Sequence, residues 1–278
     1  MIVKVCDKEI NKSVILKTSV VLICALLFGR DTFALPINCH VITLISVPAF
    51  LFLDYQLLVA FIMFLIPLIS GVSAGELMLL AAISIVCKRK NNGFFQYIVI
   101  MLTIGLEVFA STYYPNINYA ELFQYFTITV VLFLLLLNYD CLDYKICVKY
   151  YFYGIICAVF VAIFGSLMSG GLDLSHLISY KFRSHIGTWV ETVDGARLVF
   201  NANTYAYFCL SGVVCGLFLL NTSVNRKNKK YIFVFTGLLG ICGMLSISRT
   251  YILVLMMVIC LYSMTGKINV HKMLRFIA

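Results

Sequence analysis

The chain has few charged residues, and the acidic ones are the scarcer kind. Lysine and arginine number 21, aspartate and glutamate 12, and the charged residues make up only 12% of the 278 positions. Soluble domains contain about one quarter charged residues. Because 62% of the chain is hydrophobic, too little polar surface remains to cover a soluble core. We therefore exclude a soluble protein and expect lipid as the solvent.

Several motifs that would indicate other classes of protein are absent. The sequence contains neither Gly-x-x-x-x-Gly-Lys-[Ser/Thr] nor Gly-x-Gly-x-x-Gly, so we expect no nucleotide and no other cofactor. The 11 cysteines form no Cys-x-x-Cys pair and no Cys/His cluster, so we expect no metal site. Most of them lie inside apolar runs, where they act as small hydrophobic residues. No small-x-small cleavage site follows the run Val20–Gly29, so we expect a retained helix rather than a signal peptide.

The apolar runs predict membrane helices. They are roughly 16–21 residues long and do not alternate with period two, whereas strands of a membrane barrel are about 9–11 residues long and alternate. The sequence therefore predicts an all-α polytopic membrane helix bundle of about ten transmembrane helices, with residues 1–278 forming a single integral membrane domain. Arg30 and Asp31 close the first span. The expected spans lie near 14–29, 35–53, 56–70, 72–87, 94–111, 122–138, 148–168, 204–220, 231–247 and 250–265.

The net charge of +9 is distributed as expected for a membrane topology signal. The basic residues lie in short turns rather than on a basic face, so we expect no nucleic-acid partner. We predict a cytoplasmic N-terminus, because every dense basic cluster then falls on the cytoplasmic side. These clusters are Lys4/Lys8/Lys12, Lys88/Arg89/Lys90, Lys145/Lys149, Arg226/Lys227/Lys229/Lys230 and Lys267/Lys272/Arg275. The segment 169–203 is then an extracytoplasmic loop, and the turn around Arg249 faces the same side.

The predicted outer loop 169–203 holds positive charge where the topology rule disfavours it. Its basic residues are Lys181, Arg183, His185 and Arg197. Binding of an anionic substrate is the plainest reason for them. Trp189, in the same loop, suits either an interfacial anchor or a platform on which a sugar stacks. We therefore include Lys181, Arg183 and Trp189 among the candidate substrate-binding residues.

Two short polar stretches each place an arginine at the edge of a span. Arg197 precedes Asn201, Asn203 and Tyr205, and Asn203 is a plausible N-cap of the eighth span. A helix N-terminus offers free N–H groups to phosphate, and an arginine can hold two phosphate oxygens at once. Taken alone, Arg197 is equally consistent with an interfacial arginine that reaches lipid headgroups.

The second stretch lies between the ninth and tenth spans, where Ser248 and Thr250 flank Arg249. Taken alone, it is also consistent with an ordinary polar turn between two spans. Two arginines on one side of the membrane, separated by two helices, predict a shared anion clamp. We therefore expect Arg197 and Arg249 to be catalytic. The expected substrate-binding residues beside them are Asn201, Asn203, Tyr205, Ser248 and Thr250.

The outer loop also holds the candidate general bases. His185, Glu191 or Asp194 can accept a proton from a hydroxyl nucleophile if it is suitably placed, and each is also consistent with a solvated loop residue. Few charges lie inside the spans, the main ones being Lys17 and Glu107. Charges concentrated at one face favour one-sided catalysis over transport.

Two stretches, Arg197 with Asn201-Ala-Asn203 and Ser248-Arg249-Thr250, resemble the motifs of the bacterial O-antigen polymerase and O-antigen ligase superfamily. The likeness covers roughly 190–265 and the span layout. The chain departs from the family pattern at Ala202, where a proline is frequent, and at Tyr251, where a glycine is frequent. Family members are usually longer, so the resemblance leaves open that this chain is C-terminally truncated.

The resemblance implies a glycosyltransferase of the bacterial inner membrane. It would join oligosaccharide repeat units, carried on polyprenyl diphosphate, into O-antigen or capsule polysaccharide at the outer face. Its implied partners are that lipid-linked donor, membrane lipid and other polysaccharide-assembly proteins. A ligase that moves finished glycan to another lipid shares the chemistry. A flippase or transporter for lipid-linked glycans, and a non-catalytic membrane subunit, remain the alternatives.

Overall fold

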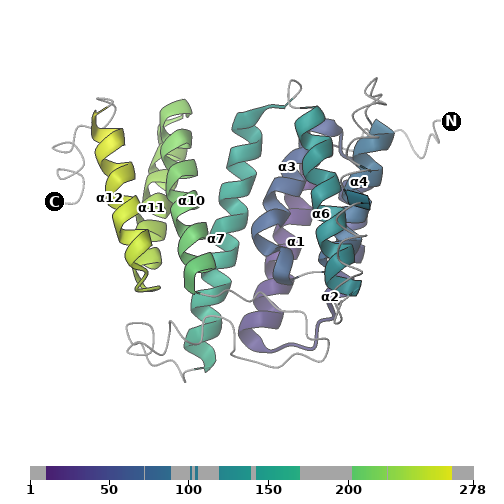
Figure 1. Ribbon diagram of the computed structural model, residues 1–278, viewed down its shortest axis with the longest axis horizontal. Coiled ribbons are helices and arrows are strands. Elements are labelled where there is room, and N and C mark those ends of the chain that lie inside the picture. The colour runs from purple at the N-terminus through teal and green to yellow at the C-terminus, as the bar shows by residue number, and fades with distance from the viewer. Residues whose placement is uncertain are drawn as a thin grey trace.

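The computed structural model describes residues 11–71, 73–88, 101, 104–105, 119–138, 142–169, 202–223 and 225–264. In these residues every regular element is a helix, which confirms the predicted all-α class (Figure 1). The elements are α1 (Lys12–Phe33), α2 (Cys39–Phe52), α3 (Tyr55–Leu65), the 3-10 helix η1 (Ile66–Gly71), α4 (Ala74–Lys88), α6 (Tyr119–Leu137), α7 (Tyr144–Ser169), α10 (Ala202–Thr222), α11 (Arg226–Met244) and α12 (Arg249–Met264).

Three helices are long and apolar enough to cross a membrane, which indicates a membrane protein. They are α1, α7 over Tyr144–Met168 and α10 over Asn203–Thr222. Shorter apolar helices cover Cys39–Phe52, Tyr55–Ile69, Leu122–Leu137 and Arg249–Ser263. Each expected span coincides with a helix except 94–111, most of which lies outside the described residues. A total of about ten membrane crossings stays a prediction.

Short polar residues fix where several helices begin. The side-chain oxygen of Asn11 accepts a hydrogen bond from the N–H of Ser13, at 3.1 Å, at the start of α1. Asn38, Asp54 and Asn225 cap α2, α3 and α11 in the same way. Such caps satisfy N–H groups that a helix leaves without an internal partner. The helix borders therefore follow from residues that are visible in the sequence.

The helices lie side by side in one bundle, with α7 near its middle (Figure 1). On one side α7 packs against α10, and on the other against α3 and α1. Gly154 of α7 allows a close approach, because a side chain there would meet the backbone carbonyl of Phe64 in α3. Phe61, Phe64 and Phe152 are fully buried around this contact. The core is thus centred on α3 and α7.

One end of the bundle is rich in cations, and we call it the basic end. There Lys12 forms an ion pair with Asp54 at 3.7 Å, and Lys145 Nζ donates to the carbonyl of Thr222 at 2.8 Å. The exposed basic turn Arg226–Lys230 opens α11 at the same end. These positions agree with the alternation of basic turns in the sequence.

At the opposite end, α1 finishes and α2, α10 and α12 begin (Figure 1). The rings of Phe28 in α1 and Phe164 in α7 are 5.5 Å apart, which places the last turns of these two helices together. His40 Nδ1 lies 3.0 Å from Glu76 Oε2, joining the starts of α2 and α4. The two predicted motifs around Asn203 and Arg249 also lie at this end.

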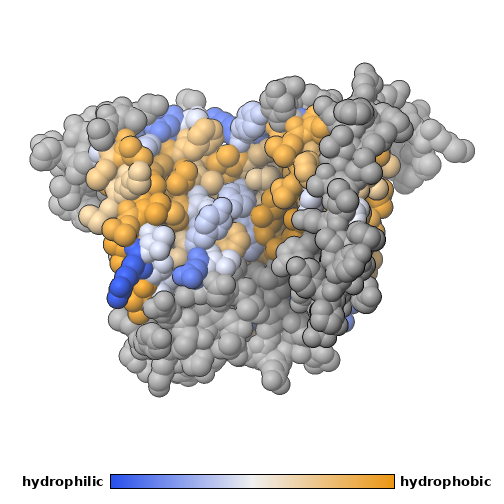
Figure 2. Space-filling model, viewed as in Figure 1, coloured by the Kyte–Doolittle hydropathy of each residue, from blue (hydrophilic) through white to orange (hydrophobic). Residues whose placement is uncertain are grey.

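The outside of the described helices is largely apolar. Figure 2 shows hydrophobic side chains over much of the coloured surface on the face in view. Large apolar residues such as Leu44, Leu136 and Leu253 are 65–70% exposed. Apolar area of this extent is unfavourable in water and favourable against lipid chains. The surface therefore agrees with the membrane assignment from helix length.

Candidate functional site

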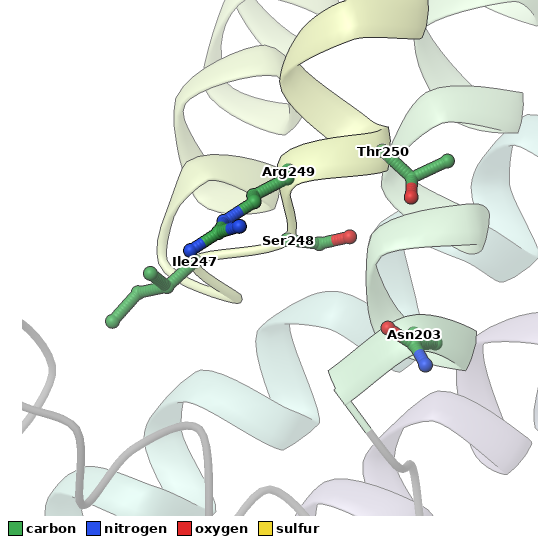
Figure 3. A pocket seen from close by; sticks show the side chains of 5 residues that line it. All are labelled: Asn203, Ile247, Ser248, Arg249 and Thr250. Atoms are coloured by element: carbon green, nitrogen blue, oxygen red, sulfur yellow. The ribbon is translucent and has the colours of Figure 1, made fainter.

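Residues of the two predicted motifs line one pocket at the end opposite the basic end. The pocket has a volume of about 350 Å³ and is lined by Asn203, Ile247, Ser248, Arg249 and Thr250 (Figure 3). Asn203 comes from the first turn of α10, and the others come from the turn after α11 and the start of α12. The fold thus brings together two stretches that the sequence identified separately.

The turn between α11 and α12 is built from backbone hydrogen bonds and one serine side chain. Ser246 Oγ donates to the carbonyl of Gly243 at 2.7 Å, and the N–H of Ile247 donates to the carbonyl of Met244 at 3.0 Å. Ile247 has φ of 52°, in the left-handed region that a β-branched residue rarely adopts. Such a conformation costs about 1–3 kcal/mol. The tight reversal places the first turn of α12 beside the first turn of α10.

Ser248 caps α12. Its Oγ accepts a hydrogen bond from the N–H of Tyr251 at 3.4 Å, and its own N–H donates to Ser246 Oγ at 3.3 Å. Both serines are buried, at 8% and 0% exposure. The hydroxyl of Ser248 was expected to contact substrate, and in the structure its oxygen caps the helix. Its hydroxyl can still donate one hydrogen bond and accept one more.

Arg249 and Thr250 are exposed at the pocket, but they point in different directions. In Figure 3 the hydroxyl groups of Ser248 and Thr250 lie on the side of α10. The guanidinium of Arg249 extends instead alongside Ile247. Asn203, also exposed, faces the pocket from α10. A long arginine side chain reaches different points at its rim by rotamer changes. The pocket therefore has a fixed polar wall and one adjustable cation.

The electrostatics of this pocket favour an anion. Both α10 and α12 begin here, so their free N–H groups and the positive ends of two helix dipoles lie close together. Neither first turn contains an acidic residue. Within the described ranges no carboxylate forms an ion pair with Arg249. An oxygen-rich anion such as phosphate is the ligand that these groups suit best.

Tyr205 lies away from the pocket lining. Its side chain is fully buried in the core, two residues and about half a turn after Asn203 in α10. We expected it to bind substrate because it follows the Asn motif. The structure instead places its ring among the packed helices, where Cys209 of the same helix is also fully buried. This arrangement supports a packing role for Tyr205 and gives no support to a substrate contact.

The other predicted site residues lie outside the described residues, so their roles stay predictions. They are Arg197, Glu191, Asp194 and His185 among the catalytic candidates, and Asn201, Arg183, Lys181 and Trp189 among the binding candidates. In the described part of the chain, no three His, Cys, Asp or Glu side chains are grouped so as to hold a metal ion. The lining of the pocket includes a guanidinium and no carboxylate, imidazole or thiolate, so it suits an anion better than a divalent cation.

The burial of one charged pair was not predicted from the sequence. Arg30 and Asp31, read as the residues that close the first span, are buried in the last turn of α1. Arg30 Nε donates to Asp31 Oδ1 at 2.7 Å and Arg30 Nη2 to Asp31 Oδ2 at 3.0 Å. Thr32 follows with a buried hydroxyl for which the described structure shows no hydrogen-bond partner. An Arg-Asp pair at the edge of an apolar run was the available signal.

Comparison of the chain with protein-family models, curated proteins and solved structures found no match. The likeness to O-antigen polymerases and ligases therefore depends on the short motifs of Arg197 to Asn203 and Ser248 to Thr250, of which Arg197 and Asn201 lie outside the described residues. Asn203 and Arg249 line the same pocket.

Proposed function

We propose that the chain is a glycosyltransferase that polymerises oligosaccharide repeat units carried on polyprenyl diphosphate into O-antigen or capsule polysaccharide. The observation that carries the proposal is the pocket shared by Asn203 of α10 and Ser248, Arg249 and Thr250 of α12. It unites the two stretches that resemble the superfamily motifs, and its donors suit the diphosphate of such a substrate.

In this reaction a hydroxyl oxygen of the acceptor glycan forms a bond to the anomeric carbon of the donor. The bond from that carbon to the diphosphate oxygen breaks, and the lipid diphosphate leaves with the electron pair. The hydroxyl proton passes to a base, for which His185, Glu191 and Asp194 are the sequence candidates. The donor is already activated, so the step requires no nucleotide.

The role of the pocket is to stabilise the negative charge that grows on the departing diphosphate. Arg249 and the N–H groups at the starts of α10 and α12 supply donors without an intervening acid. One well-placed donor to a developing oxyanion contributes about 3–4 kcal/mol in measured enzymes. Arg197, expected just before α10, would supply the second guanidinium of the clamp.

The proposed location is the bacterial inner membrane, with several spans and the pocket at the outer face. The cations at the basic end, such as Lys12, Lys145 and Arg226, support a cytoplasmic location for that end. The pocket lies at the opposite end, where a flipped lipid-linked glycan would be presented. A ligase would have the same orientation and chemistry.

A flippase is the second candidate class. It would favour charged side chains along a cavity that crosses the bundle. In the described helices the charges concentrate near the ends, and the buried Arg30–Asp31 pair lies in the last turn of α1. Lys17, inside α1, is exposed. These placements support chemistry at one face over transport.

The test replaces Arg249 with lysine in cells, and Arg197 with lysine in a second strain. Lysine keeps the charge and loses the bidentate fork. We expect each variant to insert normally while polymer extension falls by about 100-fold or more. Arg226→Lys, the same change at the basic end, is the matched control and should extend polymer normally. Accumulation of lipid-linked units on the inner leaflet would favour the flippase, and unchanged polymer length would refute the clamp.

A further inference from the structure

The first turn of α11 carries a cluster of cations that nothing in the described structure neutralises. Arg226, Lys227, Lys229 and Lys230 are all exposed. Across the ranges that the structure describes, no carboxylate lies within ion-pair distance of any of them. Asn225 accepts from the N–H of Lys227 at 2.9 Å, so the turn that presents these charges is an ordered helix start.

The placement of these cations is unfavourable for the helix itself. The N-terminus of a helix has a partial positive charge, and natural first turns favour Asp and Glu. α11 has no acidic residue there. Lys145, whose Nζ reaches the carbonyl of Thr222 just before this turn, adds a further cation. Among the described acidic residues, Asp143 is the nearest in sequence to this cluster, and its carboxylate caps α7 by accepting from the N–H of Lys145. The positive charge of this turn, whose position is that expected of a topology signal, also suits an external anion.

An apolar stripe continues directly from this cluster. Lys227, Tyr231, Val234, Leu238 and Ile241 follow one another at intervals of three or four residues, so they lie on one face of α11. Tyr231 is 67% exposed and Ile241 is 63% exposed, and Val234 and Leu238 of the same face are also exposed. A cationic head, an amphipathic tyrosine and a line of apolar side chains thus share one helix face.

We infer that this face of α11 binds one anionic phospholipid of the surrounding bilayer. Its phosphate lies on Lys227 and Lys230, its glycerol region beside Tyr231, and one acyl chain along Val234, Leu238 and Ile241. Basic residues at the end of a membrane helix attract anionic lipid at the headgroup level, and tyrosine is enriched there. The site lies at the end opposite the pocket and goes beyond the proposed function.

The face-specific pattern provides a matched test. Lys227→Gln with Lys230→Gln removes two charges that lie three residues apart, one in the stripe and one beside it. Arg226→Gln with Lys229→Gln removes two charges that also lie three residues apart but outside the stripe. The purified full chain is placed in phosphatidylcholine bilayers that contain a spin-labelled lipid. The fraction of immobilised phosphatidylglycerol, relative to immobilised phosphatidylcholine, gives the selectivity for the anionic head.

We expect a clear phosphatidylglycerol preference in the unsubstituted chain. It should fall by about tenfold or more in the Lys227/Lys230 variant, since each cation contributes roughly fivefold. The Arg226/Lys229 variant should retain most of it. Equal losses in both variants would overturn the site and leave only diffuse attraction. The inference also fails if the unsubstituted chain shows no preference, or if soluble glycerophosphate displaces the labelled lipid as well as unlabelled phosphatidylglycerol does.

Discussion

The ring of Tyr251 on α12 packs against the backbone of Gly243 on α11. The tyrosine is 2% exposed, and its hydroxyl donates to the carbonyl of Gly240 at 2.8 Å. A side chain at position 243 would meet the ring. The large Tyr251 thus lies opposite the small Gly243, and this pairing lets α11 and α12 approach closely.

Gly243→Ala should destabilise the pocket end of the bundle. The added methyl group overlaps the buried ring, and such overpacking costs about 1–3 kcal/mol. Thermal unfolding in detergent measures the loss. Tyr251→Phe keeps the ring and removes only the hydroxyl contact, so it should cost about 0.5–1.5 kcal/mol. If Gly243→Ala is as stable as the unsubstituted chain, the packing described between α11 and α12 is wrong.

Gly154→Ala should be more harmful, because its methyl group would meet a backbone atom instead of a side chain. The carbonyl of Phe64 cannot move away without displacing α3. We expect a loss of about 2 kcal/mol or more, with lower yield of folded protein. Gly237 is the control, since it has open space around the position of a side chain. Gly237→Ala should stabilise its helix by about 0.8–1 kcal/mol, and the opposite order of the two variants would contradict the α3–α7 interface.

Ile247→Gly should relieve strain in the pocket turn. Glycine adopts φ of 52° without a steric penalty, whereas isoleucine does not. Ile247 is 44% exposed, so little packing is lost. Glycine loses more conformational entropy on folding, which offsets part of the relieved strain, so we expect a net gain of up to about 2 kcal/mol. The same change at Ile241, an exposed position within α11, should instead destabilise by roughly 1 kcal/mol. Calorimetry compares the stabilities of the two variants. Equal losses of stability would mean that the backbone at position 247 is not in the left-handed conformation.

Removal of one partner from the Arg30–Asp31 pair should be costly. Asp31→Asn leaves a buried guanidinium without its bidentate carboxylate, and breaking a buried pair costs about 3–5 kcal/mol. Arg30→Met with Asp31→Leu removes both charges and should recover much of that loss. The melting temperature and the yield of the two variants decide the matter. If Asp31→Asn melts at a temperature no lower than that of the Arg30→Met/Asp31→Leu variant, the pair is solvated.

Much of the fold follows from local sequence. The caps at Asn11, Asn38 and Asp54 sit just before apolar runs, so the starts of three helices are readable without tertiary information. Apolarity alone did not reveal that α11 begins at Arg226 instead of near 231, because a helix continues through charged residues beyond its apolar part. The expected span 56–70 changes to a 3-10 helix at Ile66, next to Pro67, which lacks an N–H group.

The site was harder to predict because tertiary packing decides which residues reach it. Asn203 and Tyr205 are neighbours in one polar stretch, yet the helix turns the first toward the pocket and the second into the core. Their orientations depend on where α10 meets its neighbours, and a short motif contains no such information. The burial of Arg30 depends likewise on packing around the end of α1, which no local pattern specifies.

The hydroxyl groups of Ser246 and Ser248 are engaged with the backbone of their own turn. The backbone beside Arg249 is thus held in place by the turn itself. If the pocket binds the proposed diphosphate, binding would immobilise few side chains of this turn besides Arg249, which keeps the entropic cost of complex formation low. Selectivity on this side of the clamp would then depend on the reach and planarity of the Arg249 guanidinium.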